Sequence, residues 1–88
     1  MIVQFRSSFL KDLRNIKNKH ILARIKASIH LMEKANNLGD IPHLKKLKGG
    51  HRYFSIRLGE YRIGITHEGT TVTYVRCLNR KEIYRFFP

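Results

Sequence analysis

The sequence predicts an α+β fold, with one four-stranded antiparallel sheet that carries two helices on one face. Three patterns lead to this prediction. The chain begins with a short alternating segment, continues with apolar residues at helical spacing, and closes with alternating segments separated by glycine-containing turns. Its 88 residues are the length of one small domain, so we expect residues 1–88 to form a single unit.

The N-terminal part predicts a strand followed by a helical hairpin. Residues 2–5 alternate as a strand does. Ser7 or Ser8 is expected to cap the first helix, because a serine side chain accepts hydrogen bonds from the free N–H groups of a first turn. Apolar residues recur with helical periodicity over residues 21–35, which predicts a second helix that ends in the segment 36–39.

The C-terminal part predicts a β-meander. Residues 39–51 form a basic connector in which a proline and a glycine pair exclude a long helix. Alternating segments follow at residues 53–58, 61–66 and 71–78, and Gly59-Glu60 is suited to a hairpin turn between the first two. The pattern of the last segment leaves its inward face undecided. Because two helices cover only one face of such a sheet, we expect the other face to be open.

The charge indicates the class of partner. Eighteen Lys and Arg against six Asp and Glu give a net charge of +12, which favours nucleic acid first and an acidic protein second. The single cysteine, Cys77, excludes a disulfide framework and multi-cysteine zinc sites, and the histidines lack metal-ligand spacing. Since the chain has no long apolar run and no signal-like N-terminus, we expect a cytoplasmic protein without membrane contact.

Two arginines on the predicted hairpin are the first candidates for chemistry. Arg57 and Arg62 lie on neighbouring strands, point to the same side and are brought close by the turn. Like charges so placed repel each other unless an anion lies between them, which favours a clamp for a phosphodiester. The alternative is a pair of solvated surface arginines. Gly64 lies on the same side and is expected to leave room for a ligand.

The tail adds a second group of candidates. Arg80, Lys81 and Tyr84 lie within five residues of one another. Tyr84 is suited to stacking on a base, or to accepting a proton if nearby cations stabilise its phenolate. The alternative role for Tyr84 is to pin the chain end to the core, which is the role we expect for Phe86 and Phe87.

The hairpin segment Gly-Glu-Tyr-Arg-Ile (59–63) and the tail segment Arg-Lys-Glu-Ile-Tyr (80–84) carry a family resemblance. With them, nearly the whole chain resembles the RelE/ParE superfamily of bacterial toxin–antitoxin toxins, and in particular its RelE-like branch. The resemblance implies an mRNA interferase that cuts mRNA in the ribosomal A site, with no metal or cofactor and with the 2′-hydroxyl of the RNA as nucleophile. It also implies two partners, the mRNA-bearing ribosome and a cognate antitoxin.

By position, the resemblance implies catalytic roles for four residues. Arg62 would stabilise the pentavalent phosphate, and Arg57 stands where a lysine is common. Arg80 would act as an acid or, as we expect because a guanidinium holds its proton tightly, as a stabiliser of charge. Tyr84 would be a base or a stacking platform. Further RNA contacts are expected from the connector and the tail, at Lys45, Lys46, Lys48, His51, Arg52 and Lys81.

Two positions depart from the family pattern. Ser55 stands where a second lysine is common, and Asn79 stands where a histidine often precedes the arginine. His51 in the connector is a candidate replacement for that histidine. His43, the other histidine of the connector, could likewise be an acid or a base in RNA cleavage, although a histidine in such a segment is more often a plain surface residue.

The sequence leaves two alternative functions possible. A ParE-like inhibitor of DNA gyrase would share the fold, but that branch typically lacks a complete set of the tail and hairpin residues. An inactive relative that only binds nucleic acid would show strongly salt-dependent binding without cleavage.

Overall fold

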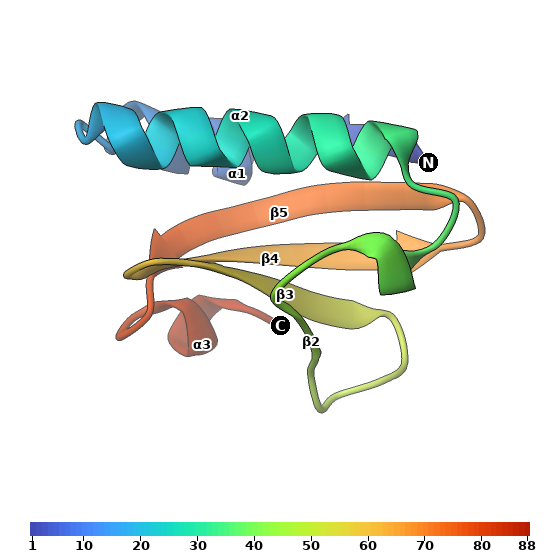
Figure 1. The fold of residues 1–88 in the computed structure, drawn as a ribbon. Coiled ribbons are helices and arrows are strands. Elements are labelled where there is room, and N and C mark those ends of the chain that lie inside the picture. The colour runs from blue at the N-terminus through green and yellow to red at the C-terminus, as the bar shows by residue number, and fades with distance from the viewer.

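A computed structural model describes residues 1–88, and it has the predicted order of a strand, a helical hairpin and a β-meander (Figure 1). Its elements are β1 (Ile2–Phe5), α1 (Ser7–Arg14), α2 (Lys19–Lys34), β2 (Leu44–Lys46), β3 (Tyr53–Leu58), β4 (Tyr61–Glu68), β5 (Thr71–Asn79) and α3 (Ile83–Phe86), with a short 3-10 turn at Leu38–Asp40. No helix combines the length and the apolar character that crossing a membrane requires.

The sheet has five strands in the order β1-β5-β4-β3-β2. β1 runs parallel to β5, whereas every other pair is antiparallel. The expected four-stranded antiparallel sheet is therefore wrong in the number of strands and in the direction of β1. The chain between β1 and β5 is long enough for either direction of pairing, and the local pattern of β1 does not choose between them. β2 was not predicted, because a three-residue strand with two lysines is too short to show an alternating pattern.

The two N-terminal helices, α1 and α2, cover the same face of the sheet, as predicted (Figure 1). Asn18 caps α2, since its side-chain oxygen accepts hydrogen bonds from the N–H groups of His20 and Ile21 at 2.9 and 3.2 Å. The helices and the strands beneath them enclose the main core, whose largest fully buried side chains are Phe9, Ile25, Met32, Ile56, Ile63, Ile65 and Tyr74.

The serine cap expected for α1 is absent. The helix starts after Arg6, and no side chain caps it. Ser8 instead lies inside the helix, where its hydroxyl donates a hydrogen bond to the carbonyl of Val75 on β5 at 2.6 Å. A tertiary contact has therefore taken the place of the local one.

A bulge explains why the pattern of β5 is ambiguous. Gly64 pairs with Arg76 and the next residue, Ile65, pairs with Tyr74, so Val75 is an extra residue in β5. Tyr74 and Cys77 consequently both face the main core although they are three residues apart. Strict alternation would have placed them on opposite faces.

The face opposite the helices is not open as expected, because the chain end packs on it. Ile83, Phe87 and Leu47 are buried there in a small second core. A Cβ atom at Gly64 would lie 2.5 Å from the Phe87 ring, so this glycine makes room for Phe87 and not for a ligand. Phe87 pins the chain end as predicted, whereas Phe86 is 55% exposed and does not.

Candidate functional site

A cleft of about 710 Å³ opens on the tail-covered face, beside the β3–β4 turn. It brings together residues of the connector, the hairpin and the tail. All four predicted catalytic residues line it (Arg57, Arg62, Arg80 and Tyr84), together with Lys45 and Lys81 of the predicted RNA contacts. The remaining lining residues are His43, Leu44 and Ser55.

The two hairpin arginines are direct cross-strand neighbours, as predicted. Arg62 Nη1 donates hydrogen bonds to the carbonyls of Gly59 and Tyr61 at 2.8 and 2.9 Å, which folds its guanidinium onto the turn. Gly59 has a φ of 58°, a conformation that glycine adopts without strain. Neither Arg57 nor Arg62 takes part in any of the four ion pairs. Two adjacent cations without a carboxylate between them form a site that favours an anion.

Arg80 enters the cleft from the end of β5. Its backbone N–H donates to the Glu60 carbonyl at 2.7 Å, and its Nε lies 3.0 Å from the Glu60 carboxylate. Both side chains are largely exposed, and ion pairs of this kind contribute little to stability, so a phosphate can displace the carboxylate at small cost. Asn79, which stands at the usual histidine position, accepts a hydrogen bond from the Lys81 N–H at 3.0 Å and shapes the turn into the tail.

Tyr84 is presented to the cleft by the small core beneath it. Its neighbours Ile83 and Phe87 are buried, whereas Tyr84 itself is 51% exposed. Its hydroxyl lies 3.3 Å from the Ser55 hydroxyl, which is within hydrogen-bonding distance. Ser55 is only 2% exposed, so it does not supply the phosphate contact of a lysine. It acts as a polar support under Tyr84.

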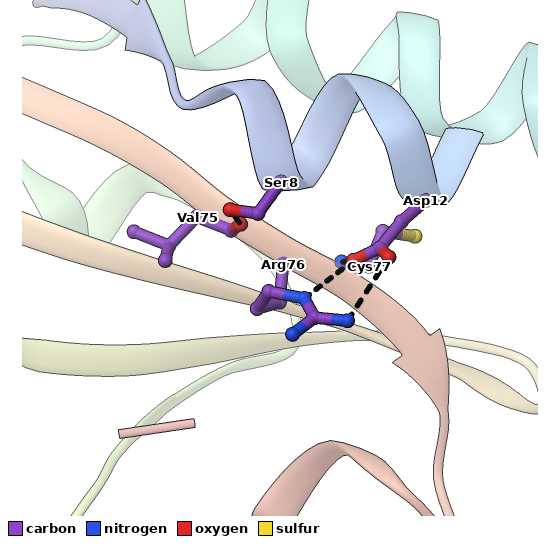
Figure 2. Close-up of polar contacts among 5 residues, drawn as sticks. All are labelled: Ser8, Asp12, Val75, Arg76 and Cys77. Carbon is purple, nitrogen blue, oxygen red and sulfur yellow. Dashed lines mark hydrogen bonds and ion pairs between the residues drawn. The ribbon is translucent and has the colours of Figure 1, made fainter. Parts of the chain in front are cut away.

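A buried carboxylate, that of Asp12, ties α1 to β5 (Figure 2). Asp12 accepts hydrogen bonds from Arg76 Nε and Nη2 at 2.8 and 3.1 Å, and from the Cys77 N–H at 2.9 Å. The side-chain hydrogen bonds to Asp12 raise the pKa of Arg76, and the Asp12 carboxylate offsets the positive charge of the guanidinium. The Arg76 guanidinium also lies 5.2 Å from the centre of the Phe86 ring. Arg76 therefore connects α1 with α3 and does not add a free cation to the cleft.

Cys77 has no role as a nucleophile in this arrangement. Its side chain is buried in the main core, and this burial raises the pKa of the thiol to about 12. A thiol of that kind stays protonated and unreactive near neutral pH.

The other predicted RNA contacts lie outside the cleft, in two different places. Lys46 and Lys48 line a neighbouring hollow that also touches Tyr84 and Phe87, so they extend the basic surface past the cleft. His51 and Arg52 lie beyond the opposite end of β3. Arg52 and Arg57 are five positions apart along an extended chain, a distance of about 17 Å.

At the N-terminal end of β3, the charge of Arg52 is offset by an acidic partner. Arg52 Nη1 lies 2.9 Å from the Glu68 carboxylate, and Arg52 Nη2 donates to the Tyr53 hydroxyl at 2.9 Å. Its hydrogen bonds to Tyr53 and Glu68 raise the pKa of this exposed guanidinium. His51 lies in the hollow beside this pair and not in the cleft. It is therefore not placed to replace the histidine that relatives carry before the tail arginine.

One cleft residue, His43, stood out in the sequence only as one of two connector histidines. It has a φ of 62°, a left-handed conformation that is uncommon for any residue other than glycine. Its carbonyl accepts a hydrogen bond from the Arg57 N–H at 3.1 Å, which fixes it against β3. The pairing of β2 with β3, which the sequence did not reveal, places His43 among the residues that line the cleft. No three His, Cys, Asp or Glu side chains gather as a metal site.

The chain is similar to toxins of known families over nearly its whole length. A family model described as the ParE toxin of the type II toxin–antitoxin system parDE matches residues 3–84. The chain is 45% identical over 89 residues to Toxin RelE3 of Methanocaldococcus jannaschii, with 100% of both chains covered.

Solved structures agree with these matches. The toxin of a RelB–RelE antitoxin–toxin complex from Methanococcus jannaschii superposes with a TM-score of 0.82 at 42% identity, covering 97% of this chain and 99% of that one. An archaeal RelE–RelB complex from Pyrococcus horikoshii gives 0.74 at 17% identity, with 93% and 97% covered, and supports the fold alone. The family resemblance in the sequence is thus confirmed, and the chain belongs to the RelE/ParE superfamily of type II toxin–antitoxin toxins, in which it is RelE-like.

Proposed function

We propose that this toxin is a ribosome-dependent endoribonuclease that cleaves mRNA in the A site without a metal or cofactor. One observation supports this most directly. Three arginines from separate segments, Arg57, Arg62 and Arg80, line one cleft together with Tyr84. A phosphodiester is an anion of suitable size for such a cluster, and cleavage develops further negative charge that these guanidinium groups can stabilise.

The proposed reaction is an in-line displacement at phosphorus. The 2′-oxygen of the RNA forms a bond to phosphorus while the bond to the 5′-oxygen of the next nucleotide breaks. The products are a 2′,3′-cyclic phosphate and a 5′-hydroxyl. Arg62 and Arg57 face the same side of the hairpin and would hold the phosphate oxygens, and Arg80 would stabilise charge on the phosphate and the leaving oxygen.

Tyr84 contributes either proton transfer or stacking. Its exposed ring can stack on a base that has been turned out of the message. Its hydroxyl is oriented by Ser55, which favours a role in moving a proton. The substitution of Tyr84 by phenylalanine separates the two roles, because it keeps the ring and removes the hydroxyl.

The proposed partners follow from charge. A toxin of net charge +12 is drawn to the ribosome, which would hold the message in the orientation that in-line attack requires. Such a reaction takes place in the cytoplasm. We also propose a cognate antitoxin that covers the cleft cations, because the relatives from Methanococcus jannaschii and Pyrococcus horikoshii were solved as complexes with RelB.

The test is a translation reaction on a defined mRNA, with cleavage mapped by primer extension in the presence and absence of ribosomes. Wild-type toxin should cut within A-site codons only when ribosomes are present. Arg62→Ala should lose at least about a hundredfold in rate, in line with the loss of one charge-stabilising donor. Lys34→Ala on α2, on the helical side of the sheet, is the matched loss of one positive charge and should cut normally.

Intact mRNA at every toxin concentration would contradict this proposal. The family description names ParE, so the second assay would then be the supercoiling of DNA by gyrase. A protein that binds RNA but neither cleaves mRNA nor inhibits gyrase would be an inactive relative.

A further inference from the structure

We propose that His43 is the general base of the cleavage reaction and that Tyr84 is the corresponding acid. This inference rests on the proposed endoribonuclease function and names the groups that carry its two protons. It starts from a requirement of the chemistry: the 2′-hydroxyl must lose a proton, and the 5′-oxygen must gain one.

The composition of the cleft leaves few groups for these transfers. Five of its nine lining residues are lysine or arginine, whose side chains ordinarily stay protonated near neutral pH. Leu44 has no proton to exchange, and a serine hydroxyl such as that of Ser55 is not basic at neutral pH. His43 and Tyr84 remain. Imidazole is the side chain that exchanges protons most readily in this pH range, and a phenol there is normally protonated.

The backbone of His43 supports a functional role. Its left-handed φ of 62° is uncommon for a residue other than glycine, and residues in sparsely populated backbone conformations cluster at functional sites. The structure imposing it is local. The His43 carbonyl accepts a hydrogen bond from the Arg57 N–H. On its N-terminal side Ile41 is buried in the main core, and on its C-terminal side β2 begins at Leu44.

The surroundings of His43 are strongly cationic. The ionisable groups that line the two hollows to which it belongs are Arg24 on α2, Lys45 on β2, Arg57 on β3, Arg62 on β4, and Arg80, Lys81 and Tyr84 in the tail. No carboxylate lines either hollow. His43 therefore has no acidic side chain as a partner among the residues that line these hollows.

The proton balance is complete with these two residues. Neutral His43 takes the proton of the 2′-hydroxyl as the 2′-oxygen attacks phosphorus. Tyr84 gives its proton to the 5′-oxygen as the bond from phosphorus to that oxygen breaks. The enzyme is left with an imidazolium and a phenolate, the latter among the cleft cations, and proton exchange through solvent restores both.

The experiment measures single-turnover cleavage on programmed ribosomes between pH 5.5 and 8.5 for wild type, His43→Asn and His43→Gly. Both replacements tolerate a left-handed φ, so they remove the imidazole and retain the backbone conformation. The wild-type rate should rise with pH through the range in which imidazole loses its proton. Both variants should lose about a hundredfold or more in the maximal rate, keep the half-saturating toxin concentration, and lose that rise with pH.

Two further measurements separate a base from a merely structural residue. Added imidazole should restore part of the activity of His43→Gly, and it should leave Arg62→Ala inactive. His30→Asn removes an exposed α2 histidine that pairs only with Glu33, so it should behave as wild type. Thermal unfolding of each variant reports whether the fold is retained.

The outcomes are distinguishable. Wild-type cleavage together with full activity or an unchanged pH profile in His43→Asn would overturn this assignment and leave the endoribonuclease proposal standing. A loss that appears only in the half-saturating concentration would make His43 a binding residue, which also overturns it. Wild type that cuts no mRNA at all would overturn both proposals together.

Discussion

The two faces of the sheet are covered by very different amounts of protein. On one face, α1 and α2 bury a continuous core of 14 residues. On the other face, α3 and the chain end (Figure 1) cover only a small core of three buried residues. The cleft with its cations opens on this same face. The helical face is thus closed by apolar contacts, whereas the tail-covered face holds charges of one sign close together.

This difference separates stability from chemistry. Clustered cations repel one another and weaken the folded state, so the apolar free energy that offsets them must come from elsewhere. The main core supplies it on the helical face. The small core has the more limited task of holding α3, and with it Tyr84, against Ser55 at the cleft. The predictions below test this division, from the largest expected effect to the smallest.

The largest effect should come from Phe9→Ala on the helical face. Phe9 on α1 is fully buried and packs against Tyr74 on β5. Replacing a buried phenylalanine with alanine typically lowers the free energy of unfolding by about 3–5 kcal/mol. For a chain of this size such a loss is a large part of the free energy of unfolding. Denaturant titration measures it. Leu10→Ala, an exposed neighbour on α1, should change the free energy of unfolding by less than about 0.5 kcal/mol.

On the tail-covered face, Phe87→Ala and Gly64→Ala should damage activity more than stability. The first removes the ring that anchors the chain end, and the second pushes it away with a new Cβ atom. We expect at least a tenfold loss of cleavage, about 1.4 kcal/mol in the barrier, because Tyr84 is released locally. The free energy of global unfolding should fall less than in Phe9→Ala. An equal fall would mean that the two cores are one cooperative unit.

Alkaline pH should weaken the main core through Cys77. Burial raises the pKa of its thiol from the ordinary value near 9 to about 12. The folded state therefore favours the neutral thiol, and this contribution is complete below pH 9. It is lost between pH 9 and about 12 as the unfolded thiol ionises first. Cys77→Ala should reduce the loss of stability that wild type shows over this range, measured by denaturant titration. Parallel pH curves for the two proteins would contradict the assignment.

The smallest effects should distinguish the two ends of β3. Arg57→Ala should reduce the salt dependence of binding to single-stranded RNA by about 0.7 in the slope of log K against log salt, the value for one phosphate contact. Arg52→Ala should change that slope less, because Arg52 is paired with Glu68. Filter binding at several salt concentrations measures both. Equal changes would show that RNA follows β3 along its whole length.

Much of the fold was predictable because its signals are local. The apolar period of α2, the alternation of β3 and β4, and the glycine turn between them each depend on residues close in sequence. The same local geometry placed Arg57 opposite Arg62, which the structure confirms. The expected serine cap of α1 was wrong because a contact 67 residues away engages Ser8.

The candidate site was predictable only in part. The hairpin and tail residues were recognised by their motifs, and the structure brings them together. Ser55 and His43 were not understood, since their positions depend on the folding of the tail over the sheet and on β2. His51 and Arg52 lie near the cleft residues in sequence but at the other end of the strand.

By itself, the sequence determined the cationic charge, the elements with clear periodicity, and the hairpin that pairs two arginines. Tertiary structure alone decided the parallel pairing of β1 with β5, the bulge at Val75, the burial of Phe87 against Gly64, and the position of His43 at the cleft. The physical reason is the range of the interactions. Periodicity and turn geometry are fixed by neighbours along the chain, whereas strand pairing and tail packing depend on which distant apolar surfaces can be buried together.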